Sequence, residues 1–221
     1  MDALLHIEKN IAQILKTLPP GVRLEAAAKT RSAEEVRAAI KAGISIIGHN
    51  YVQEAERMRG VIDATVRWHM IGHLQKSKVK RAVRIFDMIE TLDSIELAVA
   101  LEKECEKIDA TMEVLVEVNS GNEPQKSGVA PGEVESLIGQ LDSLRRVRVK
   151  GLMTMGPWME NPQDLRPYFR LTRELFDHLH TLNLPNGEMI HLSMGMSDSY
   201  RIAIEEGATL VRLGTILFGP R

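Results

Sequence analysis

Hydrophobic residues along the chain change repeatedly between helical spacing and the short continuous runs that are typical of buried strands. Positions 4, 7, 11, 14 and 15 are apolar and predict an amphipathic helix at the start of the chain, which Pro19-Pro20-Gly21 ends. The apolar runs after it predict eight strands, at 24–29, 44–48, 65–71, 85–90, 112–118, 147–155, 188–192 and 209–213. Helices are expected between them, at 32–43, 76–81, 94–107, 132–143, 162–182 and 198–206.

This alternation determines the fold class that we predict. Apolar strands separated by helices indicate an α/β protein with a parallel sheet covered by helices. Eight strands in 221 residues fit a closed (β/α)8 TIM barrel, slightly below the usual ~250 residues. An open doubly wound sheet is the other possibility, but no Gly-x-Gly-x-x-Gly turn follows the first strand. We therefore predict a single barrel domain over 1–221 with an extra N-terminal helix.

Charge and cysteine content narrow the partners and the compartment. The net charge of -2 gives no basic footprint for nucleic acid or for an anionic membrane surface. No apolar run approaches the roughly 20 residues of a membrane span, and the first residues do not resemble a signal peptide. Cys105 is the single cysteine, so an intramolecular disulfide is impossible. We expect a soluble, unprocessed protein of the reducing cytoplasm.

The carboxyl ends of the predicted strands are where a barrel places its chemistry. Lys29 ends the first run and offers an amine there. Gly214-Thr215 follow the last strand and face Ser193-Met194-Gly195 after the seventh, where barrels commonly bind a phosphate through backbone N–H groups and hydroxyls. The glycines alone are equally compatible with tight turns that bind nothing.

A lysine that forms an imine, opposite a phosphate site, fits pyridoxal 5'-phosphate (PLP). Arg212 precedes Gly214 by two residues, on the inward side of the last strand, in reach of a ring nitrogen. An always-charged donor keeps that nitrogen unprotonated and weakens the ring as an electron sink. The same residues leave open a phosphate-binding barrel enzyme without PLP, in which Lys29 forms a Schiff base with a sugar phosphate.

Seven segments, in order along nearly the whole chain, carry a more specific signal. They are 28–30 (AKT), 48–54 (GHNYVQE), 68–75 (WHMIGHLQ), 126–128 (KSG), 151–155 (GLMTM), 192–198 (LSMGMSD) and 211–219 (VRLGTILFG). Together they resemble the YggS/PROSC family, the PLP homeostasis proteins. The resemblance implies a barrel of the fold-type III PLP-dependent kind, like the N-terminal domain of alanine racemase.

The resemblance also implies which residues bind the cofactor. Lys29 is expected to form the imine, Arg212 to face the pyridine nitrogen and Asn50 to approach the ring. The phosphate is expected to be held by Ser193, Gly214 and Thr215. No metal site and no catalytic residue are assigned.

Family members look like carriers or buffers of PLP in vitamin B6 homeostasis, without a firmly assigned turnover. The resemblance therefore implies a protein that holds PLP as a lysine Schiff base without efficient catalysis, with apo PLP-dependent enzymes as candidate partners. The alternative is a slow PLP-dependent amino-acid racemase on the same barrel. Racemases of this type need a second acid-base group from a C-terminal β-domain, and the sequence ends directly after the last strand. We expect Tyr51 and Tyr200 to pack rather than to replace that group, and we expect a monomer.

A few residues depart from the family pattern or invite a second role. His49 stands where the family usually has glutamate, and Ser77 where it usually has asparagine; His49 is expected to affect the pH response of the cavity mouth. Metal binding by His69 and His73 is disfavoured because no cysteine or paired carboxylate is nearby in sequence. Lys126 is expected to be a solvent lysine, with release or uptake of PLP as a secondary role.

Overall fold

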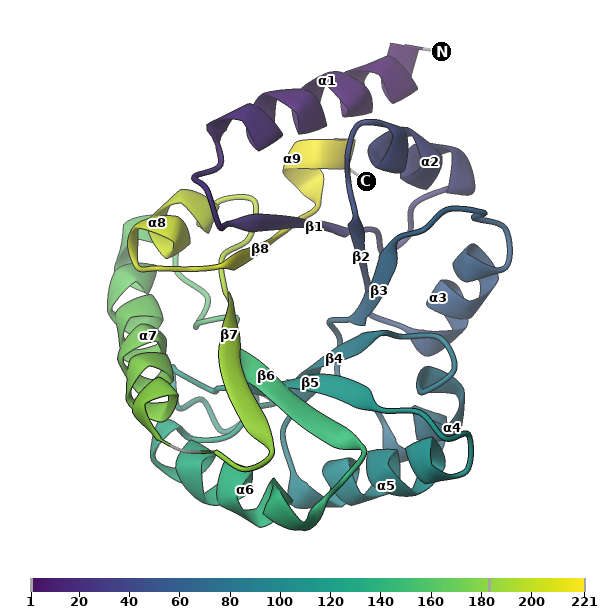
Figure 1. The fold of residues 1–221 in the computed structure, drawn as a ribbon. Coiled ribbons are helices and arrows are strands. Elements are labelled where there is room, and N and C mark those ends of the chain that lie inside the picture. The colour runs from purple at the N-terminus through teal and green to yellow at the C-terminus, as the bar shows by residue number, and fades with distance from the viewer. Residues whose placement is uncertain (1, 183, 221) are drawn as a thin grey trace.

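The computed structural model describes residues 2–182 and 184–220. Eight parallel strands form a closed barrel in chain order, and β8 pairs with β1 to close it (Figure 1). The strands are β1 (Arg23–Ala27), β2 (Ile46–His49), β3 (Arg67–Met70), β4 (Met88–Leu92), β5 (Met112–Glu117), β6 (Val147–Met153), β7 (Gly187–Ser193) and β8 (Leu210–Leu213). The predicted (β/α)8 barrel is confirmed.

Helices surround the ring of strands (Figure 1). They are α1 (Asp2–Thr17), α2 (Ala33–Lys41), α3 (Val52–Arg59), α4 (Val79–Ala82), α5 (Ile95–Glu106), α6 (Val134–Gln140), α7 (Arg166–Thr181), α8 (Tyr200–Glu205) and α9 (Thr215–Phe218). In the described part of the chain, no helix combines the length and the apolar character that crossing a membrane requires.

The start of α2 shows how local sequence determines a helix boundary. The Ser32 hydroxyl accepts a hydrogen bond from the Glu35 backbone N–H at 3.2 Å, and the Glu35 carboxylate accepts one from the Ser32 N–H at 2.7 Å. These two reciprocal bonds form a capping box. Its N-cap residue, Ser32, comes three residues after Lys29, so the segment between β1 and α2 is short and well defined.

Most predicted elements differ by a few residues from their bounds in the structure, and two of the differences have a clear cause. The fourth strand begins at Met88, not at 85. Ile85 and Phe86 lie in the turn before it, and because both are buried apolar residues, the sequence of this turn resembles that of a strand. The basic helix expected over 76–81 is reduced to a 3-10 turn, Lys76–Lys78, followed by the four-residue α4. Apolar content alone does not separate a buried turn from a strand.

The extra N-terminal helix is confirmed and packs on α2 and α9, outside the β1–β8 side of the ring (Figure 1). Its apolar face is buried at Ile7 and Ile11. The Asn10 side chain donates a hydrogen bond to the Leu217 carbonyl at 3.2 Å. Helix α1 therefore supports the short α9, which begins directly after β8.

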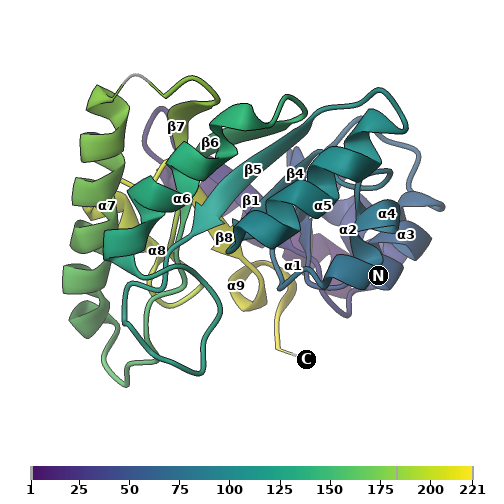
Figure 2. The ribbon, with the colours of Figure 1, turned by 90° about the horizontal axis from the view of Figure 1, so that it is seen from below.

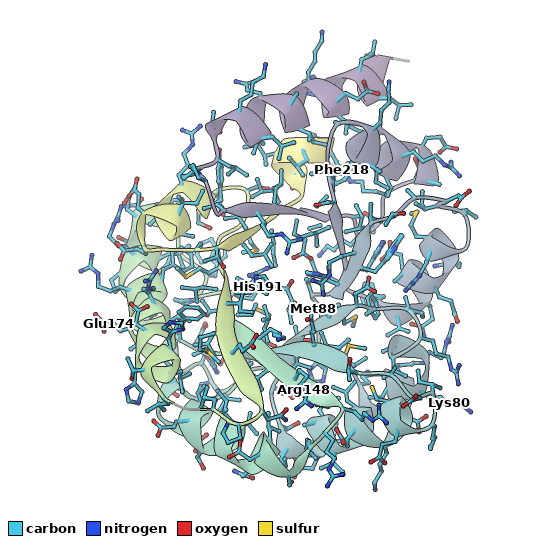
Figure 3. The ribbon with its side chains drawn as sticks, in the orientation of Figure 1. Lys80, Met88, Arg148, Glu174, His191 and Phe218 are labelled. Carbon is cyan, nitrogen blue, oxygen red and sulfur yellow. The ribbon has the colours of Figure 1, made fainter. Side chains whose placement is uncertain are left out.

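The barrel interior contains both apolar and polar side chains. Met88, Leu115 and Met153 form a small buried cluster of their own, separate from the main core. Met88 and His191 lie within the ring, whereas Lys80 and Glu174 lie on the outside (Figure 3). The loops after β5 and β6 extend past one end of the barrel, on the same side as α9 (Figure 2). This end, formed by the carboxyl ends of the strands, carries the candidate site.

Candidate functional site

A cavity of about 600 Å³ opens at the carboxyl ends of the strands. Its lining includes five of the six residues expected to bind a cofactor: Lys29, Asn50, Arg212, Gly214 and Thr215. These residues come from the first, second and last βα segments, which barrel closure makes neighbours. A cavity of this size is within the ~300–1,000 Å³ typical of small-molecule sites.

Lys29 follows β1 and is half-buried on the cavity wall. The preceding residue, Ala28, donates its N–H to the Gly48 carbonyl at 2.9 Å, which holds the strand exit against β2. The next residue, Thr30, adopts a positive φ of 64° and donates its N–H to the Glu54 carboxylate. Contacts on both sides of Lys29 thus fix its backbone at the cavity wall, which the residue lines.

Arg31 connects this first turn to the end of the chain. Its guanidinium donates a hydrogen bond to the Gly219 carbonyl at 2.5 Å and lies 5.2 Å from the centre of the Phe218 ring. The cation on the aromatic face stabilises this packing. Arg31 therefore holds the segment after β8 beside the segment after β1.

Arg212 projects from β8 and is 3% exposed. The guanidinium donates hydrogen bonds to the Thr154 carbonyl at 2.9 Å and to the Ser193 hydroxyl at 2.6 Å. It also lies 3.4 Å from the Met155 sulfur. The predicted inward orientation of Arg212 is confirmed. The side chain lies inside the barrel and also lines the cavity.

Ser193 does not line the cavity, contrary to the sequence-based expectation. It is the last residue of β7, is fully buried, and donates its hydroxyl to Glu90 at 2.6 Å while accepting from Arg212. The hydroxyl that lines the cavity is Ser197, which accepts from the Gly214 and Ile216 N–H groups at 3.3 Å each. We therefore replace Ser193 by Ser197 in the candidate phosphate site.

The loop that carries Ser197 requires a glycine at its start. Gly195 has a φ of 92°, and an added Cβ would lie 2.6 Å from the Ala203 Cβ and 2.9 Å from the Tyr200 Cα. A side chain at this position would push the loop away from α8. The absence of a Cβ therefore allows Ser197 to approach the start of α9.

The two tyrosines considered as acid-base groups do not line the cavity. Tyr51 is 63% exposed and makes no side-chain hydrogen bond within the described residues. Tyr200 is buried, and its hydroxyl accepts from Arg201 at 3.2 Å. Tyr200 packs as expected, whereas Tyr51 is mostly exposed and does not.

His49 is buried and is not among the residues that line the cavity. Its ring stacks on Trp68 with centroids 5.8 Å apart and is 0% exposed. Burial lowers the pKa of the imidazole, although the Glu54 carboxylate opposes the shift. The structure therefore does not place His49 at the cavity mouth, and the folded protein favours a neutral ring at this position.

His69 and His73 do not share a site. His69 is buried inside the barrel, whereas the His73 side chain is 55% exposed. The carboxylates that the sequence did not place near His69 are Glu25 and Glu90, from β1 and β4. Glu25 and Glu90 are charged residues inside otherwise apolar strands, and this was the only sign of the cluster in the sequence. Such a pattern does not reveal which strands face one another.

A second cavity of about 380 Å³ adjoins the first and shares Met155, Met196 and Asp198 with it. Lys126 lines this cavity, pairs with Glu123 at 2.5 Å and donates to the Gly156 carbonyl at 3.2 Å. Lys126 is exposed, as expected, but these contacts hold its amine at the cavity rim.

Comparison with known proteins identifies the family and the fold. The family described as "Alanine racemase, N-terminal domain" matches residues 3–221. The protein named "Pyridoxal phosphate homeostasis protein" of Aquifex aeolicus is 43% identical over 203 residues, which cover 90% of this chain and 87% of the relative.

Solved structures extend the comparison. PipY of Synechococcus elongatus PCC7942, with PLP bound, has a TM-score of 0.89 and 32% identity over 96% of this chain and 100% of PipY. Alanine racemase of Clostridium difficile 630 has a TM-score of 0.78 and 15% identity, over 100% of this chain and 57% of the racemase. The racemase likeness concerns the fold alone.

Because the pKa of His49 is lowered in the folded protein, we predict that His49 makes the protein less stable at acidic pH. In the unfolded chain the imidazole has its ordinary pKa of about 6.5 and takes up a proton that the folded protein resists. The free energy of unfolding should therefore fall as the pH is lowered below about 6.5. Urea unfolding of the wild type and His49→Gln at pH 7.5 and 5 measures this term. Equal losses in both proteins would refute it.

Proposed function

Because this chain belongs to the alanine racemase N-terminal domain family and, within it, to the pyridoxal phosphate homeostasis proteins, we propose that it binds PLP in the 600 Å³ cavity and serves in PLP homeostasis. The observation that carries the proposal is the meeting of Lys29, Arg212 and the Gly214-Thr215 turn at one cavity. This chain matches 100% of PipY, whose structure has PLP bound, and this supports PLP as the ligand.

The residues of the cavity fit the groups of PLP one by one. PLP supplies an aldehyde that condenses with amines and a ring that accepts electrons. Lys29 provides the amine for a Schiff base, and Asn50 borders the same space. The Ser197 and Thr215 hydroxyls line the cavity and offer donors for a phosphate. The Gly214 and Ile216 N–H groups, which donate to the Ser197 hydroxyl in this structure, would turn to the phosphate when it binds.

Arg212 determines what the bound ring can do. We propose that its guanidinium faces the pyridine nitrogen. Arginine stays charged and can only donate hydrogen bonds, so the nitrogen facing it accepts and remains unprotonated. A ring with an unprotonated nitrogen stabilises carbanions poorly. This arrangement favours retention of PLP over chemistry at the Cα of an amino acid.

The positions of the tyrosines support a carrier rather than a racemase. Racemisation needs an acid-base group at each face of the substrate Cα. Neither Tyr51 nor Tyr200 lines the cavity of the described structure. We propose that the protein holds PLP without efficient turnover and that apo PLP-dependent enzymes receive it. Its monomeric state remains a prediction.

Borohydride reduction tests the Schiff base directly. Wild-type protein mixed with PLP should become yellow, and reduction followed by peptide mass spectrometry should find the cofactor fixed on Lys29. Lys29→Ala should stay colourless after removal of free PLP, whereas Lys126→Ala should behave like the wild type. A colourless wild-type protein, or cofactor fixed at another lysine, would exclude the proposal. Reduction of a sugar phosphate onto Lys29 instead would indicate the barrel enzyme without PLP.

Proton exchange at Cα separates the carrier from the enzyme. PLP-loaded protein is incubated with individual L- and D-amino acids in heavy water, and deuterium incorporation is followed by NMR. We expect exchange within about tenfold of that with free PLP, because an unprotonated ring is a weak electron sink. Exchange faster by orders of magnitude would reject the carrier function in favour of a racemase.

A further inference from the structure

Five polar side chains, from β1, β3, β4, β7 and β8, form a series inside the barrel. They are Glu25, His69, Glu90, Ser193 and Arg212, and each is at most 3% exposed. Barrel interiors are usually filled with branched apolar side chains, and buried charges are costly unless they are paired. Because burying these groups is costly and the series ends at the candidate cofactor cavity, we infer that the series has a function there.

The contacts in the series are short and nearly continuous. His69 Nδ1 lies 2.7 Å from Glu90 Oε1 and 3.7 Å from Glu25 Oε2. Glu90 Oε2 accepts from the Ser193 hydroxyl at 2.6 Å, and that hydroxyl accepts from Arg212 at 2.6 Å. Both carboxylate oxygens of Glu90 are thus engaged, one toward His69 and one toward Arg212.

The charged form of Glu90 is stabilised by positive groups on both sides of it in the series. Burial opposes a charged His69, but the nearby carboxyl groups of Glu25 and Glu90, of which Glu90 is hydrogen-bonded to the ring, outweigh it and raise the pKa of His69 to about 9. Burial also opposes a charged Glu90, but His69 and Arg212 hold its pKa well below the usual range. Burial and the nearby Glu90 charge raise the pKa of Glu25. At neutral pH, Glu90 is therefore an anion between two cations.

The Glu90 carboxylate lies 4.0 Å from the Arg212 guanidinium. Among residues 2–182 and 184–220, no other carboxylate lies within 4.0 Å of the Arg212 guanidinium. Thr154 contributes only a carbonyl, and Ser193 contributes a neutral hydroxyl. The hydroxyl of Ser193 is polarised because it donates to a carboxylate, which strengthens the bond that it accepts from Arg212.

We propose that Glu90, acting through Ser193 and held in place by His69, is a positioning residue that fixes the Arg212 guanidinium in the orientation that meets the cofactor ring nitrogen. The proposal rests on the proposed binding of PLP. Arg212 itself contacts the cavity, whereas Glu90, His69 and Glu25 act behind it. Removing the Glu90 charge should free the guanidinium without touching Lys29.

A metal ion is the competing explanation for this cluster. Glu25, His69 and Glu90 each offer one ligand atom, and these atoms lie within 4.8 Å of one another. However, His69 Nδ1 is already 2.7 Å from Glu90, a hydrogen-bond distance, and the Arg212 guanidinium lies 4.0 Å from Glu90. A neighbouring cation disfavours a second positive charge there.

The test measures Arg212 in the protein without PLP and the ring nitrogen in the loaded protein. Glu90→Gln keeps the side-chain shape and removes the charge. In the absence of PLP, the Arg212 side-chain N–H groups should exchange with solvent at least about tenfold faster than in the wild type, as NMR would show, because a charge-assisted contact is lost. With ¹⁵N-labelled PLP, the ring-nitrogen signal should shift while borohydride still fixes the cofactor on Lys29. Ser193→Ala, which removes the linking hydroxyl, should change both signals in the same direction.

Glu102→Gln is the matched control, because Glu102 is another buried carboxylate. It accepts hydrogen bonds from the N–H groups of Arg145, Arg146 and Val147, so its loss should lower stability. The Arg212 and ring-nitrogen signals should nevertheless stay at their wild-type values. Equal changes in Glu102→Gln and Glu90→Gln would overturn the proposal, since they would reflect loosened packing alone.

Two measurements on the wild-type protein keep the proposal testable if Glu90→Gln does not fold. The ¹³C signal of the Glu90 carboxyl should be that of a carboxylate at pH 7, and a protonated carboxyl would overturn the proposal. Metal analysis should find no stoichiometric ion, and a bound ion would assign the cluster to a metal instead. If the wild type forms no Schiff base with PLP, the proposed function fails, whereas Arg212 exchange still tests the role of Glu90.

Discussion

Pairing of the last strand with the first is the constraint on which the site depends. Arg23 to Ala26 of β1 lie in register with Leu210 to Leu213 of β8, and this pairing closes the ring. Lys29 and Gly214 are separated by most of the chain, yet each lies within two residues of the end of one of these two strands. Without closure, the amine and the phosphate turn would belong to opposite edges of an open sheet.

Several contacts outside the ring reinforce this closure. Helix α1 packs on α9, and Arg31 bonds to Gly219 and stacks on Phe218. These contacts attach the first and last segments of the chain to each other next to the cavity. The stability of this part of the fold and the geometry of the site thus depend on the same residues.

The sequence predicted the strands that close the barrel, but it predicted the contacts inside the barrel less well. Eight apolar runs predicted the eight strands, and the strand-end rule placed Lys29 and Arg212 at one cavity. Ser193 was misassigned because the sequence does not show where a strand ends within a residue or two. Its hydroxyl belongs to the interior, whereas Ser197, four residues later, faces the cavity.

The buried series from Glu25 to Arg212 was not predictable for a different reason. Strands of a parallel barrel are buried on both faces, so polarity does not alternate along them in a way that marks the inward side chains. The partners in the series also come from strands that are not consecutive, such as β4 and β7. Their contacts depend on barrel stagger, which no local pattern in one sequence reveals.

A crystal structure of the protein crystallised with PLP would show whether Lys29 and Arg212 bind the cofactor together. We expect continuous density from the Lys29 Nζ to the cofactor, with the Arg212 guanidinium at the ring nitrogen and the phosphate at Ser197 and the Gly214-Thr215 turn. PLP bound elsewhere, or in this cavity with Lys29 free and Arg212 turned away, would show that the proposed site is wrong.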